Sequence, residues 1–154
     1  MASASFASEF RLQGLIAADP TIIPASACAS PEPRRWLLVQ REARIHNPAA
    51  PNAPWHVDIL LIDQDAVLTL VEVKLAPQGT SARRQNLGQL IDYVAGARAT
   101  WNARTLASAY ATISAGDPLH LTRHTPFAPH EFWQRAEKNL TASRLRIISA
   151  ANQP

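Results

Sequence analysis

Three charged residues lie in the most apolar part of the sequence. Asp58 falls within the run VDILLI, and Glu72 and Lys74 fall within VLTLVEVKL. Burying such charges is costly unless they are paired or bind a metal. Two carboxylates brought together repel each other, and a divalent cation relieves that repulsion. Because oxygen ligands favour Mg²⁺ or Mn²⁺ over zinc, a lysine beside them predicts metal-assisted hydrolysis of a phosphodiester.

A second interpretation of the same spacing is structural. Lys74 can form an ion pair with either acid, buried or at the end of a strand. Structural ion pairs also perturb charged groups at such positions. From spacing alone, the catalytic and the structural interpretations both stay open.

The elements that must position these residues are two short strands. Residues 57–62 and 67–75 are rich in β-branched and aliphatic side chains, and residues 63–66 are typical of a turn. If the turn is centred near Asp65, residues whose numbers add up to about 130 lie opposite each other, so Asp58 faces Glu72. Lys74 then points to the same side. A slip of one residue in register would separate these side chains.

The fold class follows from the two-sided apolar pattern of this hairpin. Apolar residues occupy both the odd- and the even-numbered positions of each strand, so both faces of the sheet are apolar. This indicates that helices cover both faces. The pattern elsewhere predicts helices at about 5–19, 80–95, 105–114 and 130–141, and strands at about 35–45 and 144–150. We therefore expect one α/β (α+β) domain over residues 1–154, with a mixed central sheet.

Helical spacing also predicts which side chains face inward. In the first helix the expected apolar stripe is Phe6, Phe10, Leu12, Leu15 and Ile16, and Pro20 ends the helix. In the second helix, which Thr80 or Ser81 can cap, the expected buried stripe is Leu87, Leu90, Ile91, Val94 and Ala95. In the third helix we expect Leu106, Tyr110 and Ile113 to point inward.

Composition excludes several classes of protein. Thirteen of the fifteen basic residues are arginine and the formal charge is +3, which favours a polyanionic partner but also fits a genomic base bias. Cys28 is alone, so no internal disulfide or cysteine-rich zinc module is expected. The sequence shows neither an apolar run of the ~20 residues that cross a bilayer nor a secretory leader. We expect a soluble, cytoplasmic protein with no membrane partner.

Three histidines between residues 120 and 130 are a weaker candidate for a metal site. His120 and His124 are four residues apart, which suits metal binding on a helix. Pro118, Pro126 and Pro129 disfavour a continuous helix here, so a solvated loop is the preferred interpretation.

The ordered charged residues resemble a known family. Asp58, then Glu72-Val73-Lys74, then a helix with Gln89 and Tyr93 are similar to the PD-(D/E)xK nuclease superfamily, which has the restriction-endonuclease-like fold. The Gln-x-x-x-Tyr spacing resembles its RecB-type members. The segments EFRLQGLIAADPTIIP, VDILLIDQDAVLTLVEVKLAPQGTSARRQNLGQLIDYVAGA and EFWQRAEKNLTASRLRIISA resemble successive parts of one bacterial branch. The ordered combination is far more specific than a lone D…ExK pattern.

This resemblance implies a metal-dependent nuclease that cleaves DNA or RNA, with DNA as the favoured expectation. It assigns Mg²⁺ or Mn²⁺ to Asp58, Glu72 and the backbone carbonyl of Val73, with help from Glu9 in the first helix. It assigns to Lys74 the role of assisting the attacking water. The helix residues that border the site and orient the substrate are Gln89 and Tyr93, one turn apart. The residues expected to contact phosphates are Arg83, Arg84, Arg41 and Arg44.

The chain departs from the family pattern in two places. Val57 stands where the family often has a proline before the first aspartate. The sequence also stops soon after the last predicted strand, whereas the related branch usually continues into a further helical segment. We therefore expect either a minimal or truncated member, or a homodimer or partner protein that completes the C-terminal side. The alternative function is a catalytically inactive nuclease-fold module that binds nucleic acid or a protein partner.

Overall fold

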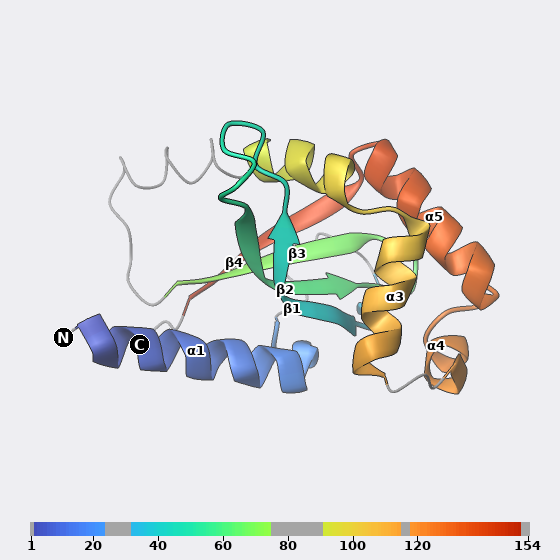
Figure 1. The fold of residues 1–154 in the computed structure, drawn as a ribbon. Coiled ribbons are helices and arrows are strands. Elements are labelled where there is room, and N and C mark those ends of the chain that lie inside the picture. Colours follow the sequence, from blue (N-terminus) through green and yellow to red (C-terminus); the bar gives the residue numbers. More distant parts are fainter. Residues whose placement is uncertain (1, 24–31, 75–90, 115–117, 152–154) are drawn as a thin grey trace.

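The structure is a computed structural model that describes residues 2–23, 32–74, 91–114 and 118–151 (Figure 1). The helical elements are α1 (Ala2–Ala18), the 3-10 helix η1 (Pro20–Ile22), residues 91–100, α3 (Ala103–Ile113), α4 (Pro118–His124) and α5 (Pro129–Thr141). The strands are β1 (Leu37–Ile45), β2 (Trp55–Ile62), β3 (Leu68–Lys74) and β4 (Leu145–Ala151). The predicted succession of helices and strands is confirmed within these ranges, with α4 as an addition.

The four strands form one mixed sheet in the order β1-β2-β3-β4. β1 pairs antiparallel with β2, and β2 pairs antiparallel with β3. β3 and β4 run parallel, which requires a crossover, and α3, α4 and α5 all lie in that connection. The predicted mixed α+β architecture is therefore confirmed.

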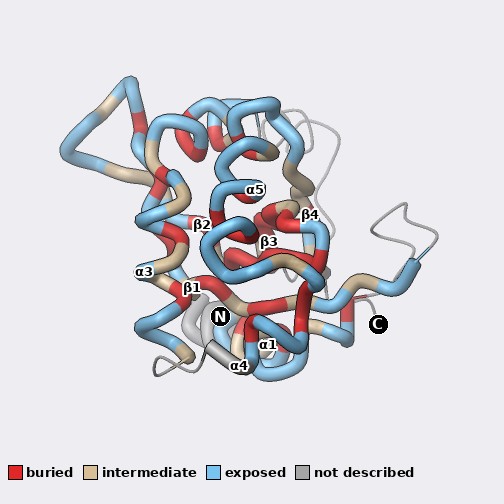
Figure 2. The backbone as a smooth tube through the Cα atoms, turned by 90° about the vertical axis from the view of Figure 1, so that its right-hand side faces the viewer, coloured by how far each residue is buried: buried red, intermediate tan, exposed pale blue. Residues whose placement is uncertain are grey.

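Helices cover the sheet on both faces, as the two-sided apolar pattern predicts (Figures 1 and 2). On one face α1 packs through Ile16 against Ile59, Leu61 and Val71. The other face carries a larger cluster beneath α3 and α5, in which Leu60 and Leu70 meet Leu106 and Phe132. Consecutive residues of β2 and β3 thus enter different cores, because side chains alternate along a strand.

The turn between β2 and β3 is fixed by a buried carboxylate. Asp63 is fully buried and accepts hydrogen bonds from the backbone N–H groups of Asp65 and Val67. Its other oxygen accepts from the guanidinium groups of Arg34 (3.3 Å) and Arg146 (2.6 Å). A buried carboxylate held by two arginines ties the segment before β1 and strand β4 to this turn.

The helix at residues 91–100 buries a different face from the one that the apolar pattern predicts. Ile91 is 71% exposed, whereas Tyr93 and Ala97 are buried. A Cβ atom on Gly96 would lie 2.5 Å from the carbonyl oxygen of His46, so the helix backbone itself packs against the end of β1. Of the predicted stripe, Ile91 and Ala95 are exposed and Val94 is half-buried, and Leu87 and Leu90 lie outside the described residues. Small residues permit the close approach to β1 and therefore set the buried face.

The first and third helices show smaller differences of the same kind. In α1, Phe10 and Leu15 are more than half exposed, while Gln13 and Ile16 are buried. In α3, Leu106 and Tyr110 point inward as predicted. Ile113 is 45% exposed, because the last turn of that helix extends beyond the core.

The histidine-containing segment is helical and not a solvated loop. Pro118 stands at the beginning of α4 and Pro126 lies beyond its end, so the prolines bound the helix without interrupting it. His124 is buried and packs edge-on against Phe132, while His120 is exposed. The loop prediction is therefore wrong.

Within the described residues, no helix combines the length and the apolar character that crossing a membrane requires.

Candidate active site

The register of β2 against β3 is the one predicted from the turn. Ile59 pairs with Val71 and Leu60 pairs with Leu70. The pairing ends there, and Asp58 and Glu72 are the next residues on the two strands. Both residues are half-buried, at the end of the hairpin away from its turn.

The carboxylate of Asp58 lies against the backbone of β3. The N–H group of Val73 donates a hydrogen bond of 2.7 Å to Oδ2 of Asp58. A side chain therefore takes the place of a strand carbonyl here, and it fixes the orientation of the carboxylate relative to the Glu72-Val73-Lys74 segment. Lys74 closes β3 and pairs in register with Ala151 of β4, and its side chain lies outside the described part of the chain.

Strand β2 loses its regular alternation at Asp58, and the neighbouring β1 is irregular at the same level. Val57 belongs to the core beneath α3, whereas Ile59 belongs to the core beneath α1, although they are two residues apart. On the neighbouring strand, Glu42 has a positive φ of 50°. A side chain in this left-handed region is strained, and such strain concentrates at functional sites.

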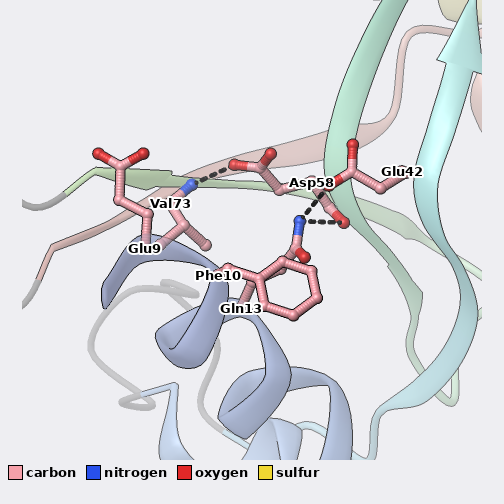
Figure 3. A pocket seen from close by; sticks show the side chains of 6 residues that line it. All are labelled: Glu9, Phe10, Gln13, Glu42, Asp58 and Val73. Carbon is pink, nitrogen blue, oxygen red and sulfur yellow. Dashed lines mark hydrogen bonds between the residues drawn. The ribbon is translucent and has the colours of Figure 1, made fainter. Parts of the chain in front are cut away.

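A small pocket opens between α1 and this irregular part of the sheet (Figure 3). Its volume is about 60 Å³. The lining residues are Glu9, Phe10, Gln13, Glu42, Asp58 and Val73. Glu9, Asp58 and Val73 come from three different elements, and the family resemblance predicts all three at one site. In Figure 3 the carboxylates of Glu9 and Asp58 lie on either side of Val73.

Gln13 joins the pocket's elements through its side-chain amide. Nε2 donates to Oε1 of Glu42 at 2.7 Å and to the backbone carbonyl of Asp58 at 3.2 Å (Figure 3). Oε1 accepts from Nη2 of Arg41 at 2.8 Å. Gln13 is only 4% exposed, and it stands one helical turn after Glu9. The amide therefore holds α1 beside β1 and β2 and sets where Glu9 lies.

Phe10, Gln13 and Glu42 are pocket residues that sequence reasoning did not identify. The sequence predicts Phe10 in an apolar stripe, and Glu42 lies in a predicted strand with no spacing relation to Asp58. Gln13 carried a usable signal, because it stands at i+4 from Glu9. Glu42 approaches Asp58 only through the pairing of β1 with β2.

Of the residues predicted to contact the substrate, only some lie near the pocket within the described part of the chain. Arg41 lies beside the pocket, where its guanidinium carbon is 5.3 Å from the centroid of the Phe10 ring. Arg44 is exposed further along β1 and pairs in register with His56. Tyr93 is buried on the other face of the sheet, with its ring centroid 5.4 Å from that of Trp55, and it is not among the lining residues. The residues that lie outside the described part of the chain are Gln89, Arg83 and Arg84.

The pocket is lined by carboxylate oxygens, which are the kind of ligand that a hard divalent cation prefers. Glu9, Glu42 and Asp58 offer carboxylate oxygens, and Glu72 stands next to Val73 in the chain. Such oxygen donors match Mg²⁺ and Mn²⁺. Among the described residues, no three side chains of His, Cys, Asp or Glu are already grouped closely enough to hold a metal ion.

Comparison of the chain with protein-family models, with curated proteins and with solved structures gives no match in any of the three.

Proposed function

We propose that this protein is a metal-dependent nuclease of the PD-(D/E)xK type, with a restriction-endonuclease-like core, that hydrolyses phosphodiester bonds of nucleic acid, with DNA as the expected substrate. One observation carries the proposal. The pocket beside Asp58 also receives Glu9 from α1 and Val73 from β3. These groups are far apart in sequence, and the resemblance assigns all of them to one metal site.

The proposed roles follow from where each group lies. Asp58, Glu72, Glu9 and the carbonyl of Val73 would hold Mg²⁺ or Mn²⁺, which supplies an activated water and stabilises charge on the phosphate. Gln13 orients α1, and Val73 fixes the Asp58 carboxylate through its N–H group. In the proposal, Lys74 assists the attacking water and Gln89 orients the substrate. Tyr93 supports the start of β2 through its contact with Trp55.

The first test is metal binding and cleavage by charge-neutral variants. Asp58→Asn keeps an oxygen that can accept from Val73 while removing the charge, and Glu72→Gln does the same on β3. We expect calorimetric affinity for Mg²⁺ or Mn²⁺ to fall by more than about tenfold in each variant. Cleavage of plasmid and single-stranded DNA should fall by at least about 100-fold, as when one charged transition-state stabiliser is lost.

The matched control is Glu137→Gln, which neutralises an exposed acid on α5. It should leave both metal affinity and cleavage unchanged. Unchanged metal affinity in Asp58→Asn and Glu72→Gln would refute the proposed metal site. Metal binding without cleavage of DNA or RNA would support the alternative, a nuclease-fold module that binds nucleic acid or a protein partner without cutting.

A further inference from the structure

The pocket beside Asp58 is too small to receive a nucleotide base. Its volume of about 60 Å³ holds an ion and a few water molecules. Pockets that enclose an organic ligand are typically about 300–1,000 Å³. A scissile phosphate can therefore place an oxygen in the pocket, while the attached base must lie outside, on the rim.

That rim carries an exposed aromatic ring. Phe10 lines the pocket and is 57% exposed. Single exposed apolar side chains are common and by themselves indicate nothing. Phe10 differs from Leu15, which is equally exposed on the same helix, because its ring lies at the mouth of the acidic pocket.

The same ring is held beside a fixed positive charge. The guanidinium of Arg41 lies over Phe10, and its Nη2 atom is anchored by Gln13. An arginine stacked on an aromatic ring keeps further N–H donors for a phosphate. Phe10 and Arg41 thus place an exposed aromatic ring, which suits a base, beside a cation, which suits the backbone. We refer to these two residues as the Phe10–Arg41 platform.

We propose that the Phe10–Arg41 platform stacks one unpaired nucleobase beside the scissile phosphate, so that the substrate is single-stranded or frayed nucleic acid. The inference rests on the proposed function. Within a continuous duplex, both faces of each base are already stacked on neighbours. An unpaired base has a free face, and stacking on an aromatic side chain binds it without regard to sequence.

The experiment compares two labelled oligonucleotides of equal length and charge, one of thymidines and one with abasic sites. Binding is measured by fluorescence anisotropy, with Ca²⁺ in place of Mg²⁺ to limit cleavage. The wild-type protein should bind the thymidine strand roughly five- to 150-fold more tightly than the abasic strand. Phe10→Leu should bring this ratio close to one, and Phe10→Tyr should preserve it.

Leu15→Ala is the matched control, since it trims an equally exposed apolar side chain of α1 that does not line the pocket. Its ratio should equal the wild-type ratio, and thermal unfolding should show that all variants fold. A wild-type ratio near one, no binding of either strand, or an unchanged ratio in Phe10→Leu would overturn the inference.

Failure of this inference is distinguishable from failure of the proposed function. Suppose that Asp58→Asn abolishes metal binding and cleavage, while the wild-type protein binds the abasic strand as tightly as the thymidine strand. The proposed nuclease function is then supported, and the stacking role of the Phe10–Arg41 platform is refuted. If metal binding is absent while the Phe10-dependent ratio persists, the platform stands on a protein that binds strands without cutting.

Discussion

The amide of Gln13 connects three elements within the candidate site. It reaches Glu42 on β1, the backbone of Asp58 on β2, and Arg41, while its own backbone belongs to α1. A buried amide with all of these partners satisfied stabilises its surroundings, whereas partners left unsatisfied are costly. The side chain therefore affects both the stability of the fold and the position of Glu9.

Replacing Gln13 by leucine should lower the free energy of unfolding by about 1–3 kcal/mol, because Glu42 and Arg41 lose a buried partner. Urea unfolding monitored by tryptophan fluorescence measures this. The control is Gln134→Leu, an exposed glutamine of α5, which should leave the unfolding free energy nearly unchanged. Equal midpoints for the two variants would contradict the role given to Gln13.

At the scale of elements, the close packing of residues 91–100 on the end of β1 depends on Gly96. A Cβ atom there would also lie 2.5 Å from Cγ2 of Ile45. Gly14 of α1 is the contrasting case, since the nearest group to its Cβ position is Nη2 of Arg41 at 4.0 Å. The first glycine is required by packing, and the second only weakens a helix.

The two glycines should therefore respond oppositely to alanine. Gly96→Ala should destabilise the protein by about 1–3 kcal/mol through overpacking against backbone. Gly14→Ala should stabilise it by roughly 0.5–1 kcal/mol, through better helix propensity with no new clash. Thermal unfolding of both variants gives the signs, and destabilisation by Gly14→Ala together with stabilisation by Gly96→Ala would refute this account of the packing.

At the scale of the whole molecule, the sheet keeps its two polar clusters apart. The pocket with Asp58 lies toward the start of β2, and the buried Asp63 with its two arginines lies just beyond the other end. His124 belongs to this second cluster. Burial lowers the pKa of His124 to about 4, aided by the charges of Arg35 and His120 and opposed by contacts with Asp63.

This pKa makes the fold sensitive to acid. In the unfolded chain the pKa of His124 is about 6.5. Between that pH and about pH 4, His124 is protonated in the unfolded chain but neutral in the folded chain. Above about pH 6.5, His124 is neutral in both states, so it does not change the free energy of unfolding. Stability should then fall as the pH drops toward 4, by about 2 kcal/mol between about pH 7 and about pH 5.

Urea unfolding at the two pH values tests this linkage. His124→Gln should lose most of the difference attributed to the histidine, whatever its effect at neutral pH. His130→Gln replaces an exposed histidine at the start of α5 and should keep the wild-type difference. An identical pH response in wild type and His124→Gln would show that His124 does not carry it.

The sequence alone predicted the hairpin and, for a turn centred near Asp65, the register that pairs Ile59 with Val71. It also determined that both faces of the sheet are covered. Strand alternation and turn chemistry are local, so they can be read from neighbouring residues. The metal, the substrate class and the roles of Lys74 and Gln89 remain predictions.

Only the tertiary structure decided which distant groups join Asp58. Gln13 and Glu42 reach the pocket through the docking of α1 and the pairing of β1, which no local pattern encodes, whereas the family resemblance already assigned Glu9 to this site. The exposure of Phe10 and Ile91 was likewise decided by packing, because periodicity finds an apolar stripe without saying which side of it meets the sheet. Close approach at a glycine, and not the size of the aliphatic side chains, selected that side for residues 91–100.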